Sequence, residues 1–448
     1  MMSHLCDLAV VVRYFVRRMH PAQQVTLGYA AYIAVGWGLL CLPWSRTAVP
    51  AGMLDHLFIA TSAVSTTGLS TISVADCYTF FGQLVVLALI QLGGVGYMTF
   101  GSCIVLARKQ VLSRNRVNVG KAVFTLPDSF DLRHFLRVTV AYTLIVEGIG
   151  AAALYGVFRS EGVPDAGWSA VFHSVSSFCT AGFSLYNSSF EGYAGHMGVN
   201  AVVSALSIAG AIGFIVAVDF WNRLTGRVAA ITLTSRIILV STAILLVVGT
   251  TLLFLQEPTI QARPFGERGL AAFFQAMTAM TTVGFNTIPI GALSKASILL
   301  LVVLMVIGSS PSGTGGGLKC TTITAFIGIM RGALRGEETV RFWNRPIPPE
   351  RLWTAAAGVG FYVAVLIAGT YLLDLTETAG FDQLLFEAAS ALGTVGLSMG
   401  ITAALTVWGK VTIIALMFCG RISPLMFGLA FFAPDTDGAE RPNNDFAV

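Results

Sequence analysis

A short segment with the pattern Thr-x-Gly occurs four times in the chain. Its copies align without a gap as FIATSAVSTTGLS from Phe58, FHSVSSFCTAGFS from Phe172, FQAMTAMTTVGFN from Phe274 and FEAASALGTVGLS from Phe386. Every copy begins with Phe, has a hydroxyl residue at the fifth position, and has Thr and Gly at the ninth and eleventh positions. A single Thr-x-Gly would suit ordinary helix packing, because membrane helices use both residues for close contacts. Four gapless copies indicate an internal structural repeat instead.

The chemistry that this pattern supports is the coordination of a cation by neutral oxygen atoms. Glycine permits a positive φ, so consecutive carbonyl groups can turn to one side and replace the hydration shell of an ion. No carboxylate lies in the four Thr-x-Gly segments, which favours a large, weakly hydrated monovalent ion, K⁺ before Na⁺, and disfavours Ca²⁺. The expected filter residues are Thr66, Thr67, Gly68, Thr180, Ala181, Gly182, Thr282, Val283, Gly284, Thr394, Val395 and Gly396.

The elements that would position these segments are membrane helices. Of the 448 residues, 55% are hydrophobic and only 11% are charged, against about 25% charged residues in soluble domains. Apolar runs of about 20 residues can cross a bilayer. We read eight of them, at 25–44, 80–107, 136–158, 198–220, 233–255, 297–330, 354–374 and 405–432.

A weaker apolar stretch follows the first, third, fifth and seventh runs, and each such stretch is too short to cross the bilayer. We therefore expect an all-α integral membrane protein with four M1-P-M2 repeats around a central pore. Each repeat would contain a span, a re-entrant pore helix with its filter loop, and a second span. Extended backbone at membrane depth is tolerated only where it lines a cavity or is buried in protein.

The predicted repeats occupy residues 25–107, 136–222, 233–331 and 354–432, between an N-terminal arm, 1–24, and a C-terminal tail, 433–448. Most of the 27 Lys and Arg residues fall on the side of the membrane that carries both termini. The positive-inside rule places that side in the cytoplasm. The net charge of +4 is too mild to indicate a nucleic-acid partner. The seven cysteines form no C-x-x-C pair and are read as apolar packing residues.

One predicted span is interrupted by the sequence GSSPSGTGGGLK, where a helix cannot continue. It is not a phosphate-binding loop, because Leu318 separates Gly317 from Lys319. A filter selects but does not close a pathway, so this segment is the best gate candidate, with a Gly-rich packing break as the alternative. Lys319 would hold the closed form through a carboxylate or carbonyl partner. The gate candidates are Gly308, Ser309, Ser310, Pro311, Ser312, Gly313, Thr314, Gly315, Gly316, Gly317, Lys319 and Arg421.

Arg421 lies in the apolar run LMFCGRISPLMF, where a charge costs at least about 2.5–3.5 kcal/mol. It therefore faces a cavity or partner, or it snorkels to the cytoplasmic interface. Glu147, inside the third apolar run, carries the same kind of cost and has no evident partner in the sequence. His173, in the second short stretch, is expected to be a packed polar group.

These motifs resemble the Trk/Ktr/HKT superfamily of K⁺ transporters. Besides the four filters, the resemblance rests on QLGGVGYMTFG at 91–101, GSSPSGTGGGLKCTT at 308–322 and GRISP at 420–424, and it covers about residues 22–430. Members of one plant-type branch that pass Na⁺ have Ser at the first filter glycine, so Gly68 favours K⁺. Thr67 and Ala181 depart slightly from the family pattern and leave fine selectivity open.

The resemblance implies the K⁺-translocating subunit of an uptake system in the bacterial plasma (inner) membrane, with both termini cytoplasmic, closest to the Ktr membrane subunit. It also implies a loop across the pore below the filter, Arg421 at the pore axis, a homodimer, and cytosolic Rossmann-type nucleotide-binding regulatory subunits. We expect no tightly bound cofactor beyond K⁺ in the filter, with Na⁺ left open as an activator.

The alternatives are a Trk-type subunit and a secondary K⁺ symporter coupled to Na⁺ or H⁺. Secondary transporters show halved symmetry with broken helices, which fourfold repetition disfavours. We expect no enzyme, because the chain has no Ser/His/Asp set, no H-E-x-x-H motif and no Cys/His cluster.

Overall fold

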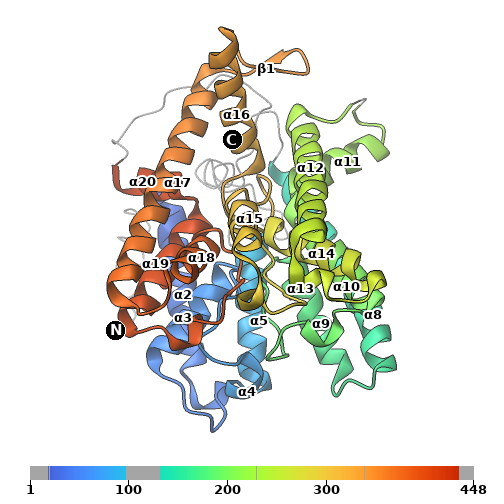
Figure 1. Cartoon of the computed structure of the whole chain (residues 1–448), viewed down its shortest axis with the longest axis vertical. Helices are drawn as coiled ribbons and strands as arrows, with labels where there is room; N and C mark the ends of the chain where they lie inside the picture. Colours follow the sequence, from blue (N-terminus) through green and yellow to red (C-terminus); the bar gives the residue numbers. More distant parts are fainter. Residues whose placement is uncertain (1–18, 20, 97–131, 229, 338, 433–448) are drawn as a thin grey trace, which may run out of the picture.

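The computed structural model describes residues 19, 21–96, 132–228, 230–337 and 339–432. This part of the chain is almost wholly helical (Figure 1), apart from one small antiparallel hairpin of β1 (Arg341–Phe342) and β2 (Arg345–Pro346). The predicted C-terminal tail, most of the N-terminal arm and residues 97–131 lie outside the described residues. So do the predicted end of the second span and the second half of the 91–101 motif.

The helices follow one another in the same order four times. Each unit has a long helix, a short helix, a Thr-x-Gly segment and a second apolar helix. The long helices are α2 (Pro21–Leu40), α8 (Leu132–Ser160), α12 (Leu233–Gln256) and α17 (Pro349–Thr376). The short helices are α3 (Met53–Val64), α9 (Ala166–Phe178), α14 (Phe265–Met280) and α18 (Phe381–Leu392). The second apolar helices are α5 (Phe80–Val95), α10 (Met197–Ile212), α15 (Lys295–Val306) and α19 (Val407–Ile422).

Shorter or following helices complete the described part. They are α4 (Val74–Cys77), α11 (Phe214–Leu224), α13 (Pro258–Gln261), α16 (Cys320–Arg335) and α20 (Pro424–Phe432). Four single turns of 3₁₀ helix lie in the connections, at Pro43–Ser45, Glu191–Tyr193, Ile290–Ala292 and Thr402–Ala404.

The four units pack in a closed ring that follows the chain order. The second apolar helix of each unit packs on the short helix of the next, because α5 contacts α9, α10 contacts α14 and α15 contacts α18. The ring closes where α19 contacts α3, so that the last unit lies beside the first (Figure 1). The Phe that opens each copy of the repeat is fully buried, as Phe58, Phe172, Phe274 and Phe386.

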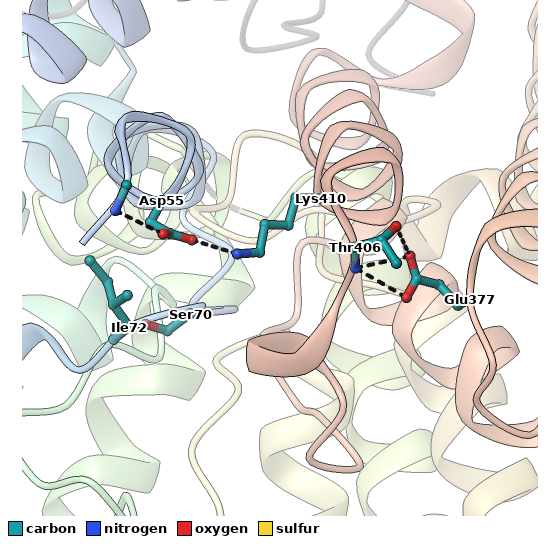
Figure 2. Close-up of polar contacts among 7 residues, drawn as sticks. Asp55, Ser70, Ile72, Glu377, Thr406 and Lys410 are labelled. Carbon is teal, nitrogen blue, oxygen red and sulfur yellow. Dashed lines mark hydrogen bonds and ion pairs between the residues drawn. The ribbon is translucent and has the colours of Figure 1, made fainter. Parts of the chain in front are cut away.

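Lysine and aspartate join two of these unit boundaries. Lys410 on α19 lies 2.8 Å from Asp55 in the first turn of α3 (Figure 2), and the two side chains are only 18% and 16% exposed. Lys295 on α15 faces Asp382 in the first turn of α18 in the same way, but at 4.0 Å and with the lysine 91% exposed. The boundary that joins the two ends of the ring therefore carries the tighter ion pair.

Carboxylates also cap the second helices from within a unit. Glu257, directly after α12, accepts hydrogen bonds from the backbone N–H and the hydroxyl of Ser294, the N-cap of α15. Glu377, directly after α17, accepts the same two bonds from Thr406, the N-cap of α19 (Figure 2). Each carboxylate satisfies helix N-terminal donors and links the end of the long helix to the start of the second apolar helix of its unit.

Three described helices, α8, α12 and α17, are long and apolar enough to span a membrane alone. The bent pairs α10 with α11 and α19 with α20 raise this to five if each pair is one span. The chain is thus a multi-pass membrane protein by composition and helix length, and the eight predicted spans remain a prediction.

Two predicted spans, 198–220 and 405–432, are bent rather than continuous, at 90° and 94°. The first bends at Gly213, which has φ +91° and whose neighbours donate to the Gly-rich segment, Phe214 N–H to Ser312 O and Ile215 N–H to Ser312 Oγ. The second bends at Ser423, with φ +78°, directly before Pro424, which has no N–H to continue the helix. The third counterpart is the non-helical segment between α15 and α16.

Candidate functional site

The four Thr-x-Gly segments meet in one ring. A Cβ placed on Gly68 would lie 2.5 Å from the carbonyl oxygen of Ala181, and one on Gly182 would lie 2.2 Å from that of Val283. A Cβ placed on Gly284 would lie 2.0 Å from Val395 O, and one on Gly396 would lie 2.1 Å from Thr67 O. Each glycine thus abuts the middle carbonyl of the next segment, in chain order and back to the first. All twelve predicted filter residues are brought together.

The backbone of each segment alternates in handedness. The four glycines have φ from +65° to +95°, and the four threonines, Thr66, Thr180, Thr282 and Thr394, have φ from +48° to +57°. A β-branched residue at positive φ is a genuine outlier, and four of them at equivalent positions mark a site where the surrounding structure imposes the strain. Positive φ at these positions allows successive carbonyl groups to turn to the same side of the segment.

The hydroxyl at the fifth position of the repeat supports three of the four segments. Ser62 Oγ accepts from Gly68 N–H at 3.0 Å, and Ser390 Oγ accepts from Gly396 N–H at 3.1 Å. Ser176 instead donates to Phe183 O at 2.8 Å. Thr278 Oγ1 is buried and has no hydrogen-bond partner within the described residues. The first and fourth segments are therefore fixed alike, and the second and third differ from them.

On one side of the ring lies an open cavity of about 370 Å³, lined by all four filter glycines. Its wall continues through the residues after each glycine and includes Ser70, Ser184, Asn286 and Ser398. No carboxylate, lysine or arginine is among its lining residues in the described part of the chain. The cavity leads directly onto the glycine end of the filter segments.

The other side of the ring is filled by the Gly-rich segment, which touches all four threonines. Thr314 Oγ1 lies 3.1 Å from Thr180 Oγ1, and Thr314 O accepts from Thr66 Oγ1 at 3.3 Å. Gly316 N–H donates to Thr282 Oγ1 at 3.2 Å. A Cβ on Gly316 would lie 2.0 Å from Thr394 Oγ1. The segment therefore closes directly against the threonine end of the filter.

The Gly-rich segment is held in place by hydrogen bonds to backbone groups. Ser310 Oγ lies within hydrogen-bonding reach of Ala211 O and Ile212 O at the end of α10. Lys319 Nζ donates to Gly315 O at 2.8 Å, so its partner is a carbonyl of the segment itself. Ser309 N–H donates to Gly316 O, which ties the entry of the segment to its exit.

Arg421 connects this segment to the first filter and to α5. Its Nη1 donates to Thr66 Oγ1 at 2.9 Å and to Thr314 O, while its Nη2 donates to Gly93 O and, at 3.4 Å, to Gly94 O. These contacts point inward, and all of its described acceptors are uncharged. The partly buried guanidinium adds a positive charge at the threonine end of the ring.

Sequence reasoning missed the partners of Glu147, which come from two other elements. Glu147 Oε2 accepts from Gln91 Nε2 of α5 at 3.2 Å, and Oε1 lies 3.7 Å from Cys179 Sγ, just before the second filter. The acceptors of Arg421 on α5 were missed for the same reason. The one signal in the sequence was the polar residue Gln91 within the motif QLGGVG, which indicated that α5 carries more than packing residues.

Comparisons with known proteins identify a family model, similar sequences and a similar fold. The TrkH family model, described as a cation transport protein, matches residues 39–435. Ktr system potassium uptake protein B of Bacillus subtilis is 34% identical over 439 residues, which is 96% of each chain. Potassium/sodium uptake protein NtpJ of Enterococcus hirae is 34% identical over 421 residues, 91% of each chain.

Among solved structures, the potassium transporter TrkH from Vibrio parahaemolyticus matches with a TM-score of 0.70 at 18% identity. The match covers 91% of this chain and 84% of that chain. At this identity the likeness concerns the fold.

Proposed function

Because this chain belongs to the TrkH family of cation transport proteins, as a Ktr/Trk-type potassium uptake subunit, we propose that it moves K⁺ through the ring of Thr-x-Gly segments. The observation that carries the proposal is the ring itself, in which each filter glycine abuts the carbonyl group of the next segment. It has an open cavity at the glycine end and a filled threonine end. Carbonyl oxygens and threonine hydroxyls replace the water of a weakly hydrated cation without a compensating carboxylate.

In this proposal selection and closure are separate steps. The filter carbonyls select K⁺, and the driving force is the membrane potential. The segment 308–318 is the intramembrane gate, because in the described conformation it covers the threonine end of all four filter segments. Arg421 and Lys319 hold that conformation, and the charge of Arg421 opposes a cation leaving the filter.

The wider assembly is also proposed. We place the chain in a bacterial plasma membrane as a Ktr-type subunit with both termini cytoplasmic, working as a homodimer with cytosolic Rossmann-type nucleotide-binding subunits. The name of the Bacillus subtilis relative refers to a Ktr system, which supports a membrane subunit that acts with other components. The Enterococcus hirae relative is named for potassium and sodium, which keeps Na⁺ activation within the proposal.

Flux from purified protein in liposomes tests the proposal. Uptake of K⁺, Rb⁺, Na⁺ and Li⁺ is compared at a set membrane potential, with and without gradients of Na⁺ and H⁺. We expect K⁺ and Rb⁺ to pass well ahead of Na⁺ and Li⁺, driven by the potential alone. K⁺ uptake that stops when the Na⁺ and H⁺ gradients are removed would instead support a coupled symporter.

A further inference from the structure

The residue two positions after each filter glycine is polar in all four copies of the repeat, and all four line the outer cavity. They are Ser70, Ser184, Asn286 and Ser398. Each is partly exposed, and none is part of the Thr-x-Gly pattern. We propose that these four residues form an outer cation-binding ring, a site for a partly hydrated monovalent cation at the entrance of the filter. This inference rests on the proposed function of the filter.

The hydroxyl protons of Ser70 and Ser398 are donated into the protein and not toward the cavity. The hydroxyl of Ser70 donates to Ile72 O (Figure 2). The hydroxyl of Ser398 donates to Glu387 Oε1 at 2.6 Å. A hydroxyl has one proton and two lone pairs, so a proton donated into the protein leaves the oxygen as an acceptor toward the cavity.

Ser184 behaves in the same way because of the tautomer of His173. His173 Nε2 accepts from Leu185 N–H at 3.3 Å, and its Nδ1 lies 2.8 Å from the acceptor Ser169 O. The ring is therefore protonated at Nδ1, and Nε2 is an acceptor. Ser184 Oγ, 3.0 Å from Nε2, must then donate its proton to it.

Asn286 completes the set with its amide. Its Nδ2 donates to Glu191 Oε1 at 2.7 Å and to Ile288 O at 3.1 Å. Two acceptors at this atom fix the orientation of the amide, since the carbonyl end would face them with lone pairs. Both amide protons are thus engaged, and Oδ1 remains as the acceptor.

The four side chains therefore present oxygen lone pairs, and within the described residues at least one lone pair on each has no donor. Ser184 Oγ accepts Tyr186 N–H, and Ser398 Oγ accepts Gly400 N–H and lies 2.9 Å from Thr402 Oγ1. The Thr402 hydroxyl lies closer to Glu387 Oε1, at 2.5 Å, and we assign its proton there. A ring of neutral oxygen acceptors suits a cation. The same oxygens can accept hydrogen bonds from the water molecules that the cation keeps.

Carboxyl groups behind the ring keep its oxygens as acceptors, because they accept the protons of Ser398 and Asn286. Glu387 is fully buried, and one of its oxygens has no hydrogen-bond partner within the described residues. Glu191 stands behind Asn286 in the same way. These carboxylates act through the ring residues, so we regard Glu387 as a positioning residue.

The test measures K⁺ uptake into liposomes as a function of the external K⁺ concentration. It also measures the unfolding temperature of the same protein in detergent over the same range of K⁺ concentrations. The double variant Ser70→Ala/Ser184→Ala removes two ring oxygens and strands no charge. We expect the half-saturating K⁺ concentration to rise about threefold to tenfold, with maximal flux and the K⁺/Na⁺ ratio unchanged. Ser188→Ala, an exposed serine outside the cavity lining, is the matched control.

Glu387→Leu is the second variant and removes the acceptor of the Ser398 and Thr402 protons. Without this acceptor the Ser398 hydroxyl can turn its proton toward the cavity, so the half-saturating K⁺ concentration again rises. Unchanged K⁺ midpoints in both variants, or lower maximal flux with an unchanged midpoint, would overturn the outer ring. If the proposed function is wrong, the parent protein shows no K⁺-selective flux. In that case the K⁺ dependence of the unfolding temperature still tests the outer ring.

Discussion

The two ends of the filter ring differ in what covers them. At the glycine end the ring opens into a cavity of about 370 Å³. At the threonine end the segment 308–318 touches the threonines of all four units, and Arg421 donates to both the first threonine and this segment. The fourfold pattern is present at both ends, but among the described residues the covering segment comes from the third unit alone.

If the segment 308–318 is the gate, as proposed, this difference indicates how a repeated chain acquires one. The four Thr-x-Gly segments are nearly equivalent, so none of them can close the path without disturbing selection. The breaks in the second helices are repeated as well, at Gly213, at Ser423 and between α15 and α16. Only the last of these is long enough to reach across the ring. In the proposed function, one of these repeated breaks serves as the gate, while the four Thr-x-Gly segments keep their common arrangement.

Deletion of Gly313 to Gly317 should cause the largest change in K⁺ flux, because it removes what covers the threonine end. The deletion removes the backbone that contacts Thr66, Thr180, Thr282 and Thr394, so the threonine end should stay open. If the closed state dominates in the parent, K⁺ flux should rise about tenfold to a thousandfold and no longer respond to a regulatory partner. Flux into liposomes measures this, with the K⁺/Na⁺ ratio expected to stay at the parent value. A stably inserted variant that conducts no faster would show that the segment is packing.

Replacing Arg421 tests the charge at the threonine end. Two unit charges about 6 Å apart interact by roughly 3 kcal/mol at an effective dielectric constant near 20. Arg421→Ala should therefore raise K⁺ flux, by about a hundredfold at most. Arg421→Lys keeps the charge and should stay much closer to the parent. If Arg421→Ala folds normally and its flux equals that of the parent, the guanidinium does not act on the path.

Gly68→Ser tests the other end, where selection is expected. The added Cβ would lie 2.5 Å from Ala181 O, at a backbone φ of +94°, so that carbonyl group must move. We expect the K⁺/Na⁺ flux ratio to fall about tenfold, without the rise in flux given by the gate variants. Gly162→Ser is the control, because Gly162 also has a positive φ but no atom within 4 Å of its Cβ position. An unchanged ratio at normal expression would remove Gly68 from the filter.

The smallest effect is expected at the boundary that closes the ring of units. Lys410→Gln leaves Asp55 without its ammonium partner at 2.8 Å in a largely buried position. The cost should be about 1–2 kcal/mol, seen as a drop of a few degrees in the unfolding temperature. Lys295→Gln removes the equivalent but exposed pair at 4.0 Å and should change the unfolding temperature little. Equal effects of the two variants would show that the closing boundary is not special.

The four aligned copies identified segments that the structure brings together in one ring, and their role as a filter stays a prediction. The sequence also predicted the helical break at 308–318, where Gly and Pro exclude a regular helix by themselves. It did not predict the bend at Gly213, because one glycine in an apolar run is compatible with a continuous helix, and it took 405–432 as one span although Pro424 interrupts that run. Gly213 bends because its neighbouring amides bond Ser312, a contact between residues about a hundred positions apart.

The partners of Arg421 and Glu147 were out of reach for the same reason. The partners of Arg421 and the Gln91 partner of Glu147 come from other units, and the repeat does not show which helix faces which. The polar residue that closes each copy of the repeat was visible in the sequence. Whether that residue is a hydrogen-bond acceptor toward the cavity depends on which neighbouring group accepts its own proton. Only the packed structure shows that group.

The most direct test of separate selection and gating is the flux of Gly316→Ala, measured for K⁺ and Na⁺ in the same liposomes. The added methyl group would lie 2.0 Å from Thr394 Oγ1 in the closed arrangement, so it disfavours that arrangement alone. Gly148→Ala, with no atom within 4 Å of its Cβ position, is the control. The account predicts higher K⁺ flux at an unchanged K⁺/Na⁺ ratio. Unchanged flux, or a ratio that falls as flux rises, would contradict it.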